Sequence, residues 1–141
     1  MAAKRRVLIL CTGNSARSQL AEALVNARMG DHWEAHSAGT QPASRVNPNA
    51  LAVLEEIGIQ TEGSHPKHLS TFIGQPFDAV ITVCDDAAEN CPVWSGQEKR
   101  LHIGFPDPAE VTGDAETILS AFRQTREAIV ARLLPALVDL G

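Results

Sequence analysis

The sequence predicts an α/β protein with an open, mostly parallel sheet of four strands and helices on both faces. Apolar runs of strand length alternate along the chain with segments of helical periodicity. The first run, Val7-Leu8-Ile9-Leu10, is continuously apolar, as is typical of a parallel strand buried on both faces. No repeat, low-complexity tract or linker divides the 141 residues, so we expect one domain over 1-141.

The start of the chain is predicted to form a strand, a helix and a second strand. Residues 5-11 make the first strand, and residues 19-28 make an amphipathic helix that ends at Gly30. Residues 33-38 make a short second strand. The helix carries apolar residues on one face at helical spacing, namely Leu20, Ala23, Leu24 and Ala27.

A second helix is predicted to start at Asn47-Pro48, after a polar loop over residues 40-46. Asparagine caps helix N-termini well, and proline fits the first turn. Gly58 ends this helix, and residues 59-70 are irregular. Its apolar stripe consists of Ala50, Val53, Leu54 and Ile57.

The second half of the chain is predicted to supply two strands and the longest helix. The strands cover residues 77-83 and 101-103, both buried, with a short helix over 85-90 between them. Asp114 caps the last helix, and Pro135 should kink it or end its regular part. The apolar face of this helix consists of Ile118, Phe122, Ile129, Leu133 and Leu137.

Charge and composition exclude several classes of function. The net charge of -5 argues against a nucleic-acid-binding or membrane-surface protein, and no apolar run has the length of a membrane span. Lys4-Arg5-Arg6 is followed by only about four strongly apolar residues, too few for a secretory signal. We therefore expect a cytoplasmic monomer with reduced cysteines.

Residues 11-18, Cys-Thr-Gly-Asn-Ser-Ala-Arg-Ser, connect the first strand to the first helix and carry the strongest functional signal. A helix N-terminus offers unpaired N–H groups and partial positive charge, which suit a tetrahedral oxyanion and favour a thiolate at Cys11. Arg17 adds a planar, charged fork for two oxygens. The alternative is a buried structural cysteine. The loop residues expected to bind the oxyanion are Thr12, Gly13, Asn14, Ser15, Ala16 and Arg17.

Two side chains are expected to shape this loop. Asn14 tolerates left-handed backbone geometry, which would turn successive N–H groups inward. Ser18 is placed to donate a hydrogen bond to the Cys11 thiolate and lower its pKa further.

Cys84 and Cys91 form a second cysteine pair, and Asp107 follows in the same half of the chain. If residues 84-91 were helical, the two Cα atoms would be about 10.5 Å apart, whereas a disulfide tolerates roughly 7 Å. A bond between them would therefore require the segment to rearrange; each could equally be an inert buried thiol. Asp107, between two prolines, is a candidate general acid or an ordinary turn residue. Because ligands bind beyond the carboxyl ends of parallel strands, Cys11, Cys84 and Asp107 should meet at one edge.

With these residues in view, the chain resembles the thioredoxin-coupled arsenate reductases, which share the low-molecular-weight protein tyrosine phosphatase fold, a flavodoxin-like three-layer sandwich. The resemblance covers essentially the whole chain. It rests on Cys-Thr-Gly-Asn-Ser-Ala-Arg-Ser-Gln from position 11, Ser-Ala-Gly at 37-39, Val-Asn-Pro at 46-48, Val83-Cys84-Asp85 with Cys91-Pro92, and Gly-Phe-Pro-Asp-Pro at 104-108.

The resemblance implies a relay of three thiols. Cys11 attacks arsenate held by the loop and Arg17, with Asp107 assisting. Cys84 then attacks Cys11 and releases arsenite, and Cys91 attacks Cys84. Thioredoxin reduces the resulting Cys84–Cys91 disulfide; glutaredoxin or a low-molecular-weight thiol is the alternative reductant. Phosphate and sulfate are expected analogues of arsenate.

No tightly bound cofactor is expected, and potassium is the one ion to consider. Some family members hold potassium near the loop with residues that match Asn14, Glu22 and Ser37, together with an aspartate. His68 lies near the aspartate's place here, which argues against a potassium site. The cysteine and histidine spacings predict no other metal site. His65, Lys67 and His68 are expected on a solvated surface.

Two competing functions use the same residues. A phosphatase of this superfamily would form a phosphocysteine at Cys11 with Asp107 as the acid, but such enzymes usually carry aromatic residues after the Asp-Pro, and this chain has no tyrosine. A thiol-based arsenite sensor would need an output element such as a basic DNA-reading helix, and none is visible. Arsenate reductase is therefore the preferred function, with weak phosphatase activity on aryl phosphates as a possible side reaction.

Overall fold

The computed structural model describes residues 4–84 and 99–140. These residues form an α/β fold around a parallel sheet, which confirms the predicted fold class. Four strands lie in the order β2-β1-β3-β4. They are β1 (Arg5–Cys11), β2 (Trp33–Gly39), β3 (Ala79–Thr82) and β4 (Lys99–His102). β1 is central and buried from Val7 to Cys11, as its unbroken apolar run predicts.

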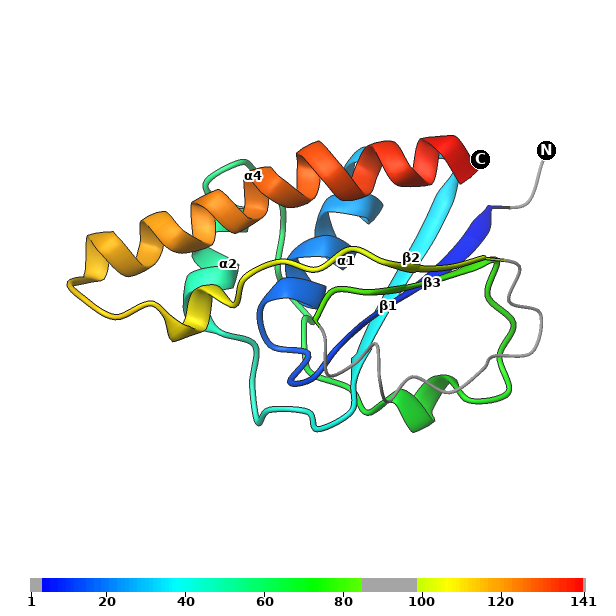
Figure 1. Ribbon diagram of the computed structural model, residues 1–141, viewed down its shortest axis with the longest axis horizontal. Helices are drawn as coiled ribbons and strands as arrows, with labels where there is room; N and C mark the ends of the chain where they lie inside the picture. Colours follow the sequence, from blue (N-terminus) through cyan, green and yellow to red (C-terminus); the bar gives the residue numbers. More distant parts are fainter. Residues whose placement is uncertain (1–3, 85–98, 141) are drawn as a thin grey trace.

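Three α-helices and two short 3-10 helices surround the strands in the described part of the chain. The α-helices are α1 (Arg17–Arg28), α2 (Pro48–Glu55) and α4 (Ala115–Leu140), and the 3-10 helices are η1 (Leu69–Phe72) and η2 (Pro108–Glu110). Figure 1 shows α1 and α4 on the same side of the sheet, with η1 on the other.

Alternation along β2 explains these layers. Ser37 Oγ donates a hydrogen bond to Glu22 Oε1 of α1 at 3.0 Å, whereas the ring of His36 lies 5.4 Å from that of Phe72 in η1. Because successive side chains of a strand point to opposite faces, α1 and η1 lie on opposite faces of the sheet.

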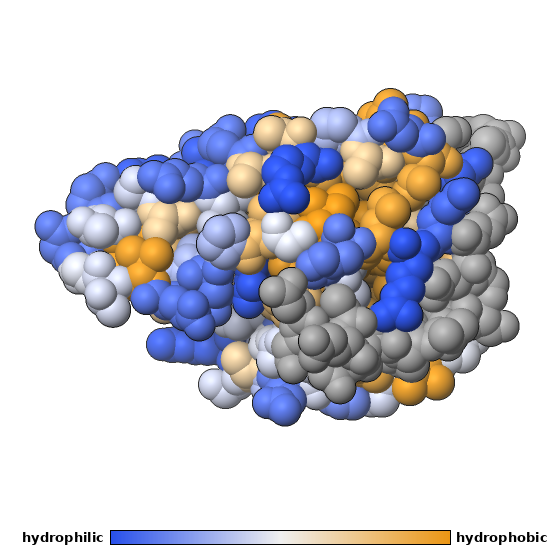
Figure 2. Space-filling model, in the orientation of Figure 1, coloured by the Kyte–Doolittle hydropathy of each residue, from blue (hydrophilic) through white to orange (hydrophobic). Residues whose placement is uncertain are grey.

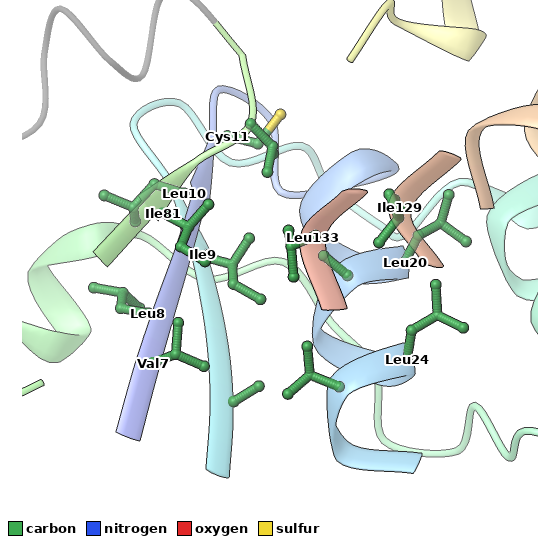
Figure 3. Packing of buried hydrophobic residues seen from close by; sticks show 14 of the residues in the cluster. Val7, Leu8, Ile9, Leu10, Cys11, Leu20, Leu24, Ile81, Ile129 and Leu133 are labelled. Atoms are coloured by element: carbon green, nitrogen blue, oxygen red, sulfur yellow. The ribbon is translucent and has the colours of Figure 1, made fainter. Parts of the chain in front are cut away.

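The core joins β1 to the two helices that cover it (Figure 3). Leu20 and Leu24 of α1 and Ile129 and Leu133 of α4 are fully buried in the same hydrophobic cluster as Ile9 of β1. Burying each such side chain contributes roughly 1.5–3 kcal/mol relative to exposure. This packing fixes the carboxyl end of β1, and with it Cys11, against the start of α1.

Two helix starts form as predicted. Asn47 Oδ1 accepts a hydrogen bond from Asn49 N at 2.9 Å at the start of α2, and Asp114 Oδ1 accepts one from Thr117 N at 2.8 Å at the start of α4. Each supplies an acceptor to a backbone N–H that has no partner inside the helix.

Two sequence predictions were wrong in detail, and one of the alternatives for Pro135 is excluded. β4 was expected to be buried, yet as the edge strand it is mostly exposed, and only Leu101 is half-buried. Of the two alternatives for Pro135, an end of the helix is excluded: α4 continues to Leu140, with Leu137 fully buried in the core, and a kink at Pro135 stays a prediction. On α1, Ala27 is exposed; Ala21 and Val25 are buried instead.

The helix expected over residues 85-90 lies outside the described residues. In the part that is described, no helix combines the length and apolar character needed to cross a membrane. Figure 2 shows mostly hydrophilic side chains at the end of the molecule where α4 begins, in keeping with the exposure of residues 111–117.

Candidate active site

The predicted site residues meet at the carboxyl edge of the sheet. Cys11 ends β1, Cys84 follows β3, and Asp107 follows β4. Backbone hydrogen bonds connect the three segments: Val83 N donates to Leu10 O at 2.9 Å, and Phe105 N donates to Val83 O at 3.2 Å. Parallel strands with a shared edge therefore bring together residues that are far apart in the sequence.

The loop between β1 and α1 has the left-handed turn that the sequence predicts. Asn14 has φ of 49° and its side chain is fully buried. Its Oδ1 accepts hydrogen bonds from Lys67 N at 2.9 Å and from Gln19 Nε2 at 3.1 Å, and its Nδ2 donates to Ser18 Oγ at 2.8 Å. Asn14 thus holds the backbone of the loop in a conformation that few non-glycine residues adopt.

The segment after β2 holds the outer side of the same loop. Gln41 N donates to Thr12 O, Ala43 N to Gly13 O, and Asn47 N to Ser15 O, each at 2.9 Å. These bonds occupy the carbonyl groups of the loop. The N–H groups of residues 13–16, by contrast, donate to no acceptor within residues 4–84 and 99–140. The loop therefore has free donors for an anion.

A cavity of about 80 Å³ lies inside the loop. It is lined among others by Cys11, Gly13, Ser15, Ala16, Arg17 and Asp107. Arg17 Nη1 donates to Phe105 O at 3.0 Å, while the buried Arg17 Nε has no partner among the described residues. An unpaired guanidinium nitrogen beside free backbone donors fits a tetrahedral oxyanion.

Asp107 faces the same cavity and is held at the start of η2. Its Oδ1 accepts a hydrogen bond from Ala109 N at 3.0 Å, and its Oδ2 lies 3.6 Å from Arg17 Nη2. The side chain is 29% exposed. One carboxylate oxygen is thus committed to the backbone, and the other lies near the guanidinium, available for proton transfer.

Cys11 and Cys84 are both buried, and they contact each other at the edge of this cavity. The Cys84 Sγ also lies 3.3 Å from Thr12 Oγ1. The hydrogen bond with Cys84, together with burial, raises the pKa of Cys11 above that of a free thiol, although Arg17 and the Thr12 backbone lower it. The sequence predicted a thiolate, so this structure differs: the second thiol favours the protonated form.

Ser18 is fully buried at the start of α1, where its hydroxyl accepts the hydrogen bond from Asn14 Nδ2. No contact between Ser18 and Cys11 is found among the described residues. Its predicted donation to the Cys11 thiolate therefore stays a prediction, and the geometry adds a role in fixing Asn14.

A second hollow of about 360 Å³ adjoins the other side of Cys84. It is lined by Arg17, Cys84, Gly104, Phe105 and Pro106. Cys91 lies outside the described residues. The described part of the chain thus places two of the three predicted thiols in contact, Cys11 lining the smaller cavity and Cys84 the larger hollow.

Three residues that support the loop were not singled out from the sequence. Gly39 lies so close to the loop that a Cβ there would overlap Thr12 O. Gln19 Nε2 donates hydrogen bonds to Asn14 O and to His65 O. The Lys67 side chain is only 16% exposed and lies beside Glu22. The expectation that Lys67 is a solvated surface residue was wrong, because residues 65–67 fold over α1. For Gly39 and Gln19 the sequence did carry a signal, because both lie within motifs that the family shares: Ser-Ala-Gly at 37-39 and the glutamine after Ser18.

Comparisons with known proteins agree with this geometry. A family model described as low molecular weight phosphotyrosine protein phosphatase matches residues 6–138. A protein of Halalkalibacterium halodurans named arsenate reductase is 39% identical over 130 residues, 92% of this chain and 93% of that relative. A solved structure of an arsenate reductase in the phosphate binding state has a TM-score of 0.83 at 27% identity and covers 97% of this chain and 99% of that chain. The Corynebacterium glutamicum thioredoxin-dependent arsenate reductase has a TM-score of 0.63 at 29% identity, covering 95% of this chain and 64% of that chain.

Proposed function

Because this chain belongs to the low molecular weight phosphotyrosine protein phosphatase family, we propose that it is an arsenate reductase that converts arsenate to arsenite. The observation that carries the proposal is the second thiol: Cys84 contacts both Cys11 and Thr12 at the anion cavity. Relatives named arsenate reductase over most of this chain's length support the same substrate.

In the first step, arsenate binds to the free N–H groups of the loop and to Arg17. The Cys11 thiolate attacks arsenic, an S–As bond forms, and one arsenate oxygen is protonated and leaves as water. Asp107 is placed to supply that proton, because it lines the same cavity as Cys11.

In the second step, the Cys84 thiolate attacks the sulfur of Cys11. The S–S bond forms as the S–As bond breaks, and its electron pair stays on arsenic, which leaves as arsenite. Arsenic gains two electrons and the two sulfurs lose two. The hydrogen bond between the thiols supports this step, since it places the attacking sulfur beside its target.

In the third step, Cys91 attacks Cys84, and Cys11 is released as a thiolate. The Cys84–Cys91 disulfide is then reduced by a dithiol protein of the thioredoxin type. The similarity to the thioredoxin-dependent enzyme of C. glutamicum supports this reductant over glutaredoxin or a small thiol.

Hydrolysis of aryl phosphates is a side activity of the same site. Cys11, Arg17 and Asp107 surround one oxyanion-sized cavity, which is the equipment for phosphoryl transfer. Such activity should need Cys11 but neither Cys84 nor Cys91.

The test is to treat the reduced protein with arsenate and map its disulfides by mass spectrometry. We expect an arsenate-dependent Cys84–Cys91 bond in the wild type and a trapped Cys11–Cys84 bond in the Cys91→Ser variant. Cys11→Ser should abolish both arsenate reduction and phosphate-ester hydrolysis, whereas Cys84→Ser should abolish only the reduction. Three free thiols after arsenate treatment, or full turnover by Cys84→Ser, would refute the relay.

A further inference from the structure

Lys67 reaches from the loop before η1 to the back of the oxyanion loop. Its Nζ donates a hydrogen bond to His65 O at 3.1 Å and lies 3.8 Å from Glu22 Oε1. The Lys67 and Glu22 side chains are only 16% and 20% exposed. An ammonium thus lies between a carboxylate and a carbonyl oxygen in a largely buried place, which is an environment built for a cation.

The backbone of Lys67 joins the same site to the loop and to β2. Lys67 N donates to Asn14 Oδ1 at 2.9 Å, and Gly39 N donates to Lys67 O at 2.8 Å. The ammonium is therefore fixed relative to Asn14, the residue that sets the left-handed turn of the loop.

The residues present do not fit a potassium ion at this place. Asn14, Glu22 and Ser37 do lie around it, and Ser37 Oγ donates to Glu22 Oε1 at 3.0 Å. The fourth ligand of the family pattern is missing, however: His68 is exposed, and its Nδ1 accepts a hydrogen bond from Ser70 N at 3.0 Å. The Lys67 ammonium already lies beside the Glu22 carboxylate, so a second cation there would meet like-charge repulsion.

We propose that Lys67 is a positioning residue whose ammonium supplies, inside the chain, the positive charge that potassium would supply, so that oxyanion binding here is independent of potassium. The reason is electrostatic. Glu22 is a largely buried carboxylate on the helix that follows the anion loop, and an uncompensated negative charge there repels a bound oxyanion. Lys67 compensates that charge without an ion from solution.

The proposal depends on the proposed function only in that the loop binds a tetrahedral oxyanion. Sulfate is therefore the probe, because it binds without reacting. Its dissociation constant is measured by titration calorimetry on the reduced protein in potassium chloride and in choline chloride of equal ionic strength. The variants are Lys67→Met, Lys67→Arg and the double variant Glu22→Gln/Lys67→Met.

We expect wild-type affinity for sulfate to be the same in both salts. Lys67→Met, which keeps the length of the apolar stem and the backbone bonds to Asn14 and Gly39, should bind sulfate roughly threefold to tenfold more weakly in choline chloride, the effect of one uncompensated charge nearby. Potassium should restore part of this loss. Lys67→Arg should bind like the wild type in both salts.

The double variant separates charge from structure. Removing both Glu22 and Lys67 charges should return sulfate affinity to the wild-type range and abolish the response to potassium, whereas a purely structural defect would remain. A wild type that binds sulfate more tightly in potassium, or a Lys67→Met variant with unchanged affinity in choline chloride, would overturn the proposal. Arsenate turnover is measured in parallel: if sulfate behaves as expected but arsenate is not reduced, the proposed function fails and this inference stands.

Discussion

Replacing Gly39 with alanine should disable the oxyanion loop while leaving the fold intact. A Cβ at this position would lie well under 3.0 Å from Thr12 O and 3.1 Å from both N and Cβ of Asn14. To restore ordinary contact distances the loop has to move by roughly 1 Å. A displacement of that size at a reacting centre costs on the order of 100-fold in rate. We therefore expect kcat/KM for arsenate to fall about 100-fold and the thermal stabilisation by phosphate to disappear.

Gly30→Ala is the matched control. A Cβ on Gly30 would also overlap a backbone oxygen, that of Asn26, but at the far end of α1. This variant should lose stability and keep its kcat/KM. Urea unfolding of both variants corrects for any shared loss of folded protein. If Gly39→Ala keeps kcat/KM within threefold of the wild type and still responds to phosphate, the close approach of β2 to the loop does not position the site.

The remaining predictions concern the thiol pair and a helix cap. The folded state raises the pKa of Cys11, so the protonated Cys11 thiol stabilises the folded protein. This contribution to the free energy of unfolding is complete below the pKa of a free thiol, about 8.5. It is lost as the pH rises further, by up to about 1.4 kcal/mol per pH unit. Urea unfolding of reduced protein between about pH 8 and pH 10 should show this loss of stability in the wild type and less of it in Cys11→Ala. The chain has no tyrosine that would also titrate in this range. An equal loss in both proteins would therefore contradict the raised pKa of Cys11. Cys84→Ala removes the largest cause of the raised pKa, so iodoacetamide should alkylate Cys11 at lower pH than in the wild type, and an unshifted profile would refute the pairing. Asn47→Ala removes the cap of α2 and should lower the free energy of unfolding by about 1 kcal/mol, measured by urea unfolding, whereas Asn47→Ser should retain most of it.

Much of the fold and the anion loop could be predicted because their signals are local. The apolar run of β1, the caps Asn47 and Asp114, and the left-handed preference of Asn14 each follow from residue type and near neighbours. The shared sheet edge then follows from parallel topology. The resemblance of the chain to arsenate reductases is likewise confirmed by its relatives.

The parts that were missed depend on contacts between distant segments. The short apolar run at 101-103 cannot distinguish an edge strand from a central one, since that depends on which strands pair. Lys67 carries no pattern of its own; its burial arises because residues 65–67 cross α1 and meet Glu22. The pKa of Cys11 depends in the same way on Cys84, which the chain brings back beside it only in the folded state.

The effect of Cys84 on Cys11 is itself an argument about function. A phosphatase needs a thiolate at neutral pH, and each unit by which the pKa is raised costs about 1.4 kcal/mol to form it. A hydrogen-bonded thiol that raises the pKa of the nucleophile therefore hinders the attack of Cys11 on phosphate and on arsenate alike, and a phosphatase gains nothing in return. It becomes useful only if the second sulfur must later attack the first, because the contact that hinders deprotonation also brings the two reacting atoms together. The residue at position 84 thus helps to decide which chemistry the anion loop favours: a second thiol there supports the proposed thiol relay over phosphoryl transfer.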